Sequence, residues 1–412
     1  MNDTTTFPKP VNGINNVSPE TNLPEGSLVS AINVDLDKEG NVRSRKGYTP
    51  LYSGSKIHSL FERYFVEGTD LKQLDSFDLP VTITTNLKPD NFLAWVTING
   101  EVIYSDGTPP KILPDILYGV PTPAGQPELS ETSGGLDAGT YQVAIVYQDH
   151  STGQISGTKL ASVISVGNNS GITLSNIPQF DGYNIVVYCS TQNGEALYQN
   201  IILPGGTTSH IIYNSRKHTR TLDTQFMEPL PGGHILRHFN GRLYCARDNV
   251  LWYSRAMRYG LHKPEEDFYQ FAAKITVVQP VTDGLYVVAD KTYFIQGNEP
   301  KTATLIVVSD DTGIEGTGIS TDGSAFGLEA SVMVAYWFSN KGAVLSLPNG
   351  KLQQLTEDRL ALNAMRHGVS MLKEQNGIRQ IITNMSDTGM SNGFGFGAQA
   401  TGTIIRNGVI IN

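Results

Sequence analysis

A strand–turn–strand unit recurs along this sequence and constrains the fold more than any other feature. Each copy has an apolar run that alternates with a period of two, a turn containing Gly or Asn, and a second apolar run. Period-two alternation is typical of strands, and a repeated unit of this size indicates a repeat architecture. The copies are residues 58–74, 91–107, 234–254, 277–297, 331–355 and 369–385.

Most copies begin at the spacing of propeller blades. Their first residues lie 33, 43, 54 and 38 residues apart, with one gap of 143 residues. A blade of four short strands takes about 40–50 residues. The sequence therefore predicts an all-β fold, a β-propeller of about six blades that carries one insertion.

The long gap corresponds to an insertion at residues 118–228. It opens with a Pro-rich linker, and six apolar runs separated by Gly-rich turns follow it. Such a run of short strands fits an inserted sandwich of the immunoglobulin or fibronectin III type. The predicted domains are 1–117 with an N-terminal hairpin and the first blades, 118–228 with the sandwich, and 229–412 with the remaining blades.

Residues 356–368, TEDRLALNAMRHG, are the one segment that predicts a helix. Thr356 is a suitable N-cap, acidic residues follow it, and Gly368 is suited to end the helix.

The charge of the chain limits its binding partners. With 30 basic and 39 acidic residues, the net charge is −9. Affinity for phosphate comes from clustered Lys and Arg, so the balance argues against a dedicated nucleic-acid binder. An acidic surface past which DNA slides without binding remains compatible with it.

Membrane and redox features are sparse. The N-terminus MNDTTTFPKP does not resemble a signal peptide, and no apolar run is long enough to span a bilayer, so we expect no membrane insertion by this chain. Cys189 and Cys245 lie in separate strand-like runs, which predicts buried free thiols and a reducing compartment at synthesis.

Residues 33–48, NVDLDKEGNVRSRKGY, have two competing interpretations. Asp35, Asp37 and Glu39 match the first ligand positions of an EF-hand loop, but the twelfth position is Lys46, which cannot bind a cation. Apolar residues alternate with the acidic ones and resume after a short turn. We therefore expect a metal-free β-hairpin with one buried face, in which arginines of the second strand pair with acidic residues of the first.

Three stretches resemble proteins of short-tailed bacteriophages. The segment GINN…LPEGSLVSAINVDLDKEGNVRSRKGY resembles the start of virion tail-hub proteins, and residues 238–260 resemble one of their blades. Residues 292–360 resemble blades of packaged-DNA stabilisation proteins, which form the tail hub or nozzle (the tail tubular type). The resemblance covers residues 25–60 and 230–360, and no catalytic motif accompanies it.

The resemblance implies a structural virion protein rather than an enzyme. Its members form a homo-oligomeric ring, expected to be a hexamer, that extends the head-to-tail connector (portal or adaptor proteins) and seats distal tail needle or fibre proteins. Such a ring retains packaged DNA and provides the ejection channel, through which DNA passes without specific binding. We expect assembly in the host cytoplasm, localisation in the virion tail, and no cofactor.

A carbohydrate-binding or glycan-hydrolysing propeller is the alternative function. It requires carboxylates that converge on one pocket. Asp106, Asp248, Asp283 and Asp290 all follow predicted strands and could meet at an axial pocket. Turns also favour Asp through local hydrogen bonds, which explains these residues without catalysis.

Two further patterns are weak as ligand sites. His234 and His238 have the spacing of a helical zinc site, but their segment is predicted as a strand, where residues four apart are roughly 13 Å distant. The glycines of 393–402 lack the strand-to-helix context of a phosphate loop. We expect no bound metal and no nucleotide.

Basic residues are densest at 213–220 and near 254–258. They lack the interleaved aromatic residues of a single-strand binding groove. Because Arg suits bidentate pairing across interfaces, we expect a subunit or connector contact. The residues predicted for it are Arg216, Lys217, Arg220, Arg255 and Arg258.

Overall fold

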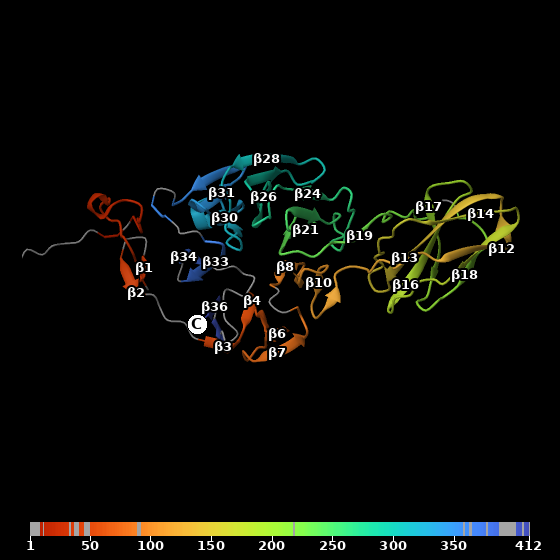
Figure 1. Cartoon of the computed structure of the whole chain (residues 1–412), viewed down its shortest axis with the longest axis horizontal. Coiled ribbons are helices and arrows are strands. Elements are labelled where there is room, and N and C mark those ends of the chain that lie inside the picture. The colour runs from red at the N-terminus through yellow and green to blue at the C-terminus, as the bar shows by residue number, and fades with distance from the viewer. Residues whose placement is uncertain are drawn as a thin grey trace, which may run out of the picture. The chain divides into compact units, whose positions relative to one another are not determined.

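The computed structural model describes residues 9–10, 12–32, 34–36, 41–44, 50–88, 92–216, 219–356, 359–361, 365–375, 378–386, 401–405 and 408–411. Strands make up nearly all regular structure in these residues, and they pair antiparallel (Figure 1). The helical elements within the described ranges are two 3-10 turns, η1 (Glu20–Asn22) and η2 (Gly323–Phe326). The predicted all-β class is confirmed.

No helix within the described ranges has the length and apolar character needed to cross a membrane.

The chain divides into two compact units. Residues 1–93 and 271–412 form the first unit, and residues 94–270 form the second. The two are considered separately below.

One plan recurs in five sheets of the described chain: four strands pair as an antiparallel meander, and in four of the five sheets they follow one another directly in sequence. In the first unit these strands are β4 (Ile57–Phe61), β5 (Tyr64–Glu67), β6 (Asp70–Leu74) and β7 (Pro80–Thr84); β25 (Val277–Val281), β26 (Gly284–Val288), β27 (Thr292–Gln296) and β28 (Thr304–Ser309); and β29 (Ile319–Asp322), β30 (Met333–Ser339), β31 (Gly342–Leu347) and β32 (Lys351–Gln354).

The second unit has two such meanders. They are β8 (Ala94–Ile98), β9 (Glu101–Ser105), β10 (Lys111–Ile112) and β11 (Ile116–Leu117), and β20 (Ile235–Phe239), β21 (Arg242–Arg247), β22 (Val250–Tyr253) and β24 (Phe268–Gln270). A shorter hairpin, β33 (His367–Gln375) with β34 (Ile378–Ser386), lies in the first unit. Every predicted copy of the repeat contains such a hairpin, so the repeat is confirmed.

Neighbouring meanders in the first unit share a core. Tyr286 of β26 and Trp337 of β30 are fully buried, with ring centroids 5.6 Å apart. The Tyr286 hydroxyl donates its one proton to a hydrogen bond shared by the carbonyl oxygens of Leu347 (2.7 Å) and Lys351 (3.1 Å). The strands β26 and β31 are buried along almost their whole length because both of their faces are covered.

Strands β12 to β18 form two packed sheets. One is ordered β12-β15-β18 and the other β14-β13-β16-β17. The strands are β12 (Glu128–Leu136), β13 (Gly139–Asp149), β14 (Ser162–Val166), β15 (Ser170–Ser175), β16 (Tyr183–Ser190), β17 (Leu197–Leu203) and β18 (His210–Ile212).

Alternate residues of the four-stranded sheet enter two different cores. Val143 and Ile145 of β13 pack with Ile172 of β15 in the core between the two sheets. Ala144 and Val146 face the other way, into a second cluster. Both faces of the four-stranded sheet are therefore buried. The inner face packs on the other sheet, and additional segments of the chain cover the outer face.

The grouping of these strands differs from that of an immunoglobulin constant domain. That domain groups its strands as ABED and CFG. Here the first, fourth and seventh strands form one sheet, and the third, second, fifth and sixth form the other. Residues 128–212 are thus a two-sheet β-sandwich with its own strand order.

A further sheet joins distant parts of the first unit. β3 (Pro50–Ser55) pairs with β35 (Thr401–Ile405), which pairs with β36 (Gly408–Ile411). Pro50 lies opposite Ile405, and Ser55 lies opposite Thr401.

The predicted hairpin at 33–48 is confirmed where it is described. β1 (Val34–Leu36) pairs with β2 (Val42–Ser44), and Asp35 lies opposite Arg43, as expected for cross-strand charge pairing. The prediction of one buried face is wrong at Val42, which is 52% exposed. Asp37, Glu39 and Lys46 lie outside the described residues.

Asparagines of the GINN motif fasten the N-terminal segment. The Asn16 side chain donates to the Ala361 carbonyl (3.0 Å) and accepts from the Ala361 amide (2.7 Å). The Asn16 amide also donates to the Arg359 carbonyl at 2.9 Å. Arg359 and Ala361 belong to the predicted helix at 356–368. That prediction is wrong for the described residues, because β33 begins at His367 and residues 359–361 form a turn and an extended stretch.

Both cysteines are buried free thiols, as predicted. Burial raises the pKa of Cys189 and of Cys245 to about 12.

Candidate functional site

Two extended segments cover the outer face of the four-stranded sheet. In one, Leu222 packs on the second cluster beside Tyr188 and Ile155. Its amide donates to the Leu197 carbonyl at 2.9 Å, and the Arg220 carbonyl accepts from the Gln199 amide at 2.8 Å. These bonds extend the sheet beyond β17 and fix the backbone that carries Arg220.

The second covering segment is the loop after β13. Asp149 accepts hydrogen bonds from the amides of Ser151 (2.8 Å) and Thr152 (2.7 Å), and from both of their hydroxyls. These bonds lower the pKa of Asp149 to about 2. The turn brings Gly153 and Gln154 to the surface, and Ile155 then returns to the cluster.

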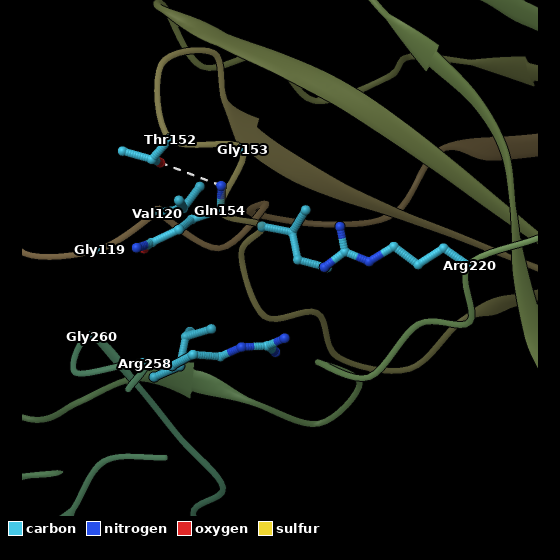
Figure 2. Close-up of a pocket in the computed structure, with 10 residues that line it drawn as sticks. Gly119, Val120, Thr152, Gly153, Gln154, Arg220, Arg258 and Gly260 are labelled. Atoms are coloured by element: carbon cyan, nitrogen blue, oxygen red, sulfur yellow. Dashed lines mark hydrogen bonds between the residues drawn. The ribbon is translucent and has the colours of Figure 1, made fainter. Parts of the chain in front are cut away.

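A pocket of about 170 Å³ lies where these segments meet the chain around residue 260. Figure 2 shows Arg220 and Arg258 reaching into it from different walls. The lining residues are Gly119, Val120, Thr152, Gly153, Gln154, Ile155, Arg220, Arg258, Gly260 and Leu261.

Glycines form one wall of the pocket. A Cβ at Gly260 would lie 2.3 Å from the Tyr118 carbonyl oxygen, and one at Gly119 would lie 3.1 Å from the Gly260 Cα. The two backbones therefore touch because neither residue has a side chain. Next to Gly260, β23 (Leu261–His262) pairs with β19 (Glu228–Pro229), and this pairing stabilises the same wall of the pocket.

Arg258 is partly neutralised. One guanidinium nitrogen donates to Asp223 at 2.6 Å, and both side chains are partly exposed. Burial would raise the pKa of Asp223, but the hydrogen bond from Arg258 and the charges of Arg258 and Arg220 outweigh it, so the pKa lies below its ordinary value. Asp223 is thus ionised at neutral pH and offsets one of the two arginine charges.

Two of the five predicted contact residues, Arg220 and Arg258, therefore meet in one pocket. Arg255 lies in an ion pair with the fully buried Asp267 (2.9 Å) and is bound within the chain. Arg216 is exposed, and Lys217 lies outside the described residues.

The carboxylates of the alternative function have local roles. Asp283 accepts from the Asn349 amide at 2.6 Å, and Asp290 accepts from the Tyr293 hydroxyl at 3.0 and 3.1 Å. Asp283 and Asp290 flank the two ends of β26, roughly 20 Å apart at the rise of a strand, so this pair does not converge.

The two carboxylates of the second unit lie in turns. Asp106 is 6% exposed, accepts from the Thr108 amide at 3.0 Å and pairs with Lys111 at 3.8 Å. Asp248 adopts a left-handed conformation, φ 53°, between β21 and β22. Both have the local bonding or backbone conformation for which turns select Asp.

The histidine pair does not form a helical metal site. His238 lies on β20, as the strand prediction requires, and its ring meets Tyr259 edge-on at 5.4 Å. Burial lowers the pKa of His238. No group of three or more metal-ligating His, Cys, Asp or Glu residues occurs in the described part of the chain.

Comparisons with known proteins leave the family open. No protein-family model and no curated protein matches the chain. Two solved structures are distantly similar: a BBS1N chain in complex with ARL6DN, soaked with lead (10% identity, 89% of this chain and 92% of that chain, TM-score 0.29), and the AfRom2 CNH domain (10% identity, 72% and 97%, TM-score 0.16). Both TM-scores are too low to carry an argument about fold or function.

Sequence reasoning missed the residues that complete the pocket. Asp223 is a single acidic residue with no motif around it, and Gly119 and Gly260 lie far apart in the chain. Tertiary folding brings these residues together, and the sequence carries no local signal for it.

Proposed function

We propose that this chain is a structural virion protein, a ring-forming hub or nozzle in the tail of a short-tailed phage. The observation that carries the proposal is the series of meander sheets together with the sheet of β3, β35 and β36. A ring of blades closes without a free edge when an early strand pairs with late ones, and β3 does so with β35. The sequence resemblance at 25–60 and 230–360 supports the same family.

In this proposal the meanders are blades of a β-propeller with about six blades. Five blades are the four-stranded sheets, and the strands of the remaining blade come from the hairpin of β33 and β34 and the sheet of β3, β35 and β36. Residues 118–228 are an insertion between blades. If β12 is counted as strand B, the four-stranded sheet has the order C′CFG, and β12 pairs with β15 as strand B pairs with strand E in an immunoglobulin domain.

The ring is a hexamer around a DNA channel. A heterologous interface closes into a ring when its rotation divides a full turn. Six copies at −9 each carry a net charge of −54, which favours an acidic channel through which the duplex slides. The ring extends the portal or adaptor proteins of the connector and seats the distal needle or fibre in the virion tail.

The basic contact residues face a neighbouring subunit or the connector rather than DNA. Arg216, Lys217, Arg220 and Arg258 serve this contact, and Arg255 supports it indirectly through its ion pair with Asp267. The protein acts without catalysis and without a cofactor.

Negative-stain class averages of the purified chain test the proposal. We expect six-fold rings with a central hole, alone or after addition of purified connector. Monomers under both conditions would refute it. A glycan panel separates the alternative function: turnover or tight binding by the wild type, lost in Asp283→Ala, would favour the carbohydrate-active propeller.

Duplex binding gives a second test of the channel. We expect negligible affinity for double-stranded DNA, before and after the change Arg216→Glu with Lys217→Glu. Tight, salt-sensitive binding that this double change removes would assign the basic segment to DNA.

A further inference from the structure

The pocket at Arg220 holds an uncompensated positive charge. Arg220 and Arg258 both line it, and Asp223 neutralises only one of them. Within the described residues, the Arg220 guanidinium has no hydrogen-bond or ion-pair partner. A charged side chain directed into a pocket without a counter-ion makes the pocket attractive to an anion.

Tyr188 supplies a second, independent observation. Its side chain is fully buried, and its hydroxyl has no hydrogen-bond partner among the residues that the structure describes. Burial raises the pKa of Tyr188. The side chain packs in the same cluster as Ile155, which lines the pocket, so this costly unpartnered donor lies directly behind the pocket wall.

The size of the pocket limits what it accepts. Its volume of about 170 Å³ lies below the range of roughly 300–1,000 Å³ typical of sites for larger organic ligands. Gly119, Gly153 and Gly260 contribute backbone without side chains to its wall. Space remains for one small polar group and a few waters.

We propose that this pocket binds one oxyanion, a carboxylate or a phosphate group, between Arg220 and Arg258. A guanidinium presents its donors as a planar fork that matches two oxygens of such a group. Arg258 keeps its bond to Asp223, which orients its remaining donors, and Arg220 supplies the charge that the ligand neutralises. The proposal does not depend on the ring.

Two sources supply this chemistry. One is a free small anion such as inorganic phosphate. The other is an acidic side chain of a second copy, since the chain has 39 acidic residues and a net charge of −9.

Calorimetric titration of the full chain with inorganic phosphate and with acetate tests the proposal. We expect one saturable site for at least one of these anions in the wild type, weakened at least tenfold by Arg220→Ala and less by Arg220→Lys. Lys88→Ala, which removes the same charge from an exposed position in the other unit, is the matched control and should bind like the wild type.

The absence of saturable binding for both anions, or equal affinity in the wild type and Arg220→Ala, would overturn the proposal. Because Arg220 is exposed, its replacement should leave the fold intact, which far-ultraviolet circular dichroism verifies. Arg220→Lys retains the charge and serves as the second variant if the alanine change disturbs folding.

Sedimentation velocity with and without phosphate distinguishes the sources. If phosphate dissociates an assembly that Arg220→Ala also weakens, the natural occupant is a carboxylate of a second copy. If self-association is the same with and without phosphate while calorimetry shows binding, the occupant is a free anion.

Discussion

Replacing Tyr286 by Phe tests how adjacent meanders are joined. Tyr286 is fully buried on β26, and its hydroxyl donates to two carbonyl oxygens near the turn between β31 and β32. Phe keeps the ring, including its contacts with Phe294 (4.7 Å) and Trp337 (5.6 Å). The change therefore removes the hydrogen bond of the Tyr286 hydroxyl between the two sheets and little else.

The expected loss follows from one shared hydrogen bond, because the hydroxyl has a single proton for the two carbonyl oxygens. Such a bond contributes a net free energy of about 0.5–1.5 kcal/mol, so its removal costs about 1 kcal/mol. With a denaturant dependence of about 2 kcal/mol per molar urea, the midpoint falls by roughly 0.5 M.

Trp337 provides the assay. It lies beside Tyr286, whereas Trp95 and Trp252 belong to the second unit. In a background with Phe at 95 and 252, tryptophan fluorescence during urea unfolding reports the first unit alone. The comparison is between this background and the same background carrying Tyr286→Phe.

Tyr293→Phe is the matched control. Its hydroxyl donates to Asp290, three residues away in the same hairpin, and its side chain is half-buried. We expect a loss of no more than about 0.5 kcal/mol, as at other partly exposed positions. Equal midpoints for the two variants would show that the Tyr286 hydroxyl does not join the sheets.

Three further predictions concern other parts of the chain. Gly260→Ala places a Cβ 2.3 Å from a backbone carbonyl oxygen, so it should lower the free energy of unfolding in urea by about 1–3 kcal/mol. Gly125→Ala is the control, because its Cβ meets nothing within 4 Å, and it should cost no more than about 0.5 kcal/mol. Equal losses in the two variants would contradict the close packing at Gly260. Burial lowers the pKa of His262 below 6.5, so the unfolded state takes up the proton first, and this contribution to stability is complete above pH 6.5 and declines as the pH falls below it. His262→Gln should flatten that decline by up to about 1.4 kcal/mol per pH unit, and an unchanged slope between pH 6.5 and 5 would argue against it. Asn16→Ala removes a reciprocal bond pair, so a glutamate-specific protease should cleave residues 12–28 faster than in the wild type, and equal rates would show that the pair does not hold the segment.

The strands of the repeat could be predicted because their signal is local. In β30, MVAYWFS, the apolar and aromatic residues that favour a strand are also those that fill the core, so sequence propensity and tertiary packing agree. The Gly- and Asn-containing turns between these strands agree with them as well, as the left-handed Asn99, Asn240 and Asn349 show.

The predicted helix failed because distant residues use its backbone. The Arg359 carbonyl accepts from Asn16 and the Ala361 amide donates to it, across more than 340 positions of sequence. A propensity for helix over a few residues is worth little against such bonds. Nothing within residues 356–368 indicates that Asn16 is their partner.

The pocket could be predicted only in part. The basic residues near 220 and 258 stand out in the sequence, and the structure brings Arg220 and Arg258 together. Arg255 has the same local character as Arg258, yet it pairs with buried Asp267 because β24 follows at that point. Which arginine remains available thus depends on strand order, and side-chain type alone does not reveal it.

The pairing of β3 with β35 makes one step of folding wait for the end of synthesis. Residue 50 cannot find residue 405 until both have been synthesised, and at about 5–20 residues per second β3 waits for roughly 20–70 s. Closing so long a loop costs on the order of 5 kcal/mol of chain entropy. Throughout that interval β3 presents an open hydrogen-bonding edge, a template for pairing with another nascent chain. The yield of correctly folded protein should therefore depend on how densely ribosomes are loaded on the message, as well as on the stability of the finished fold.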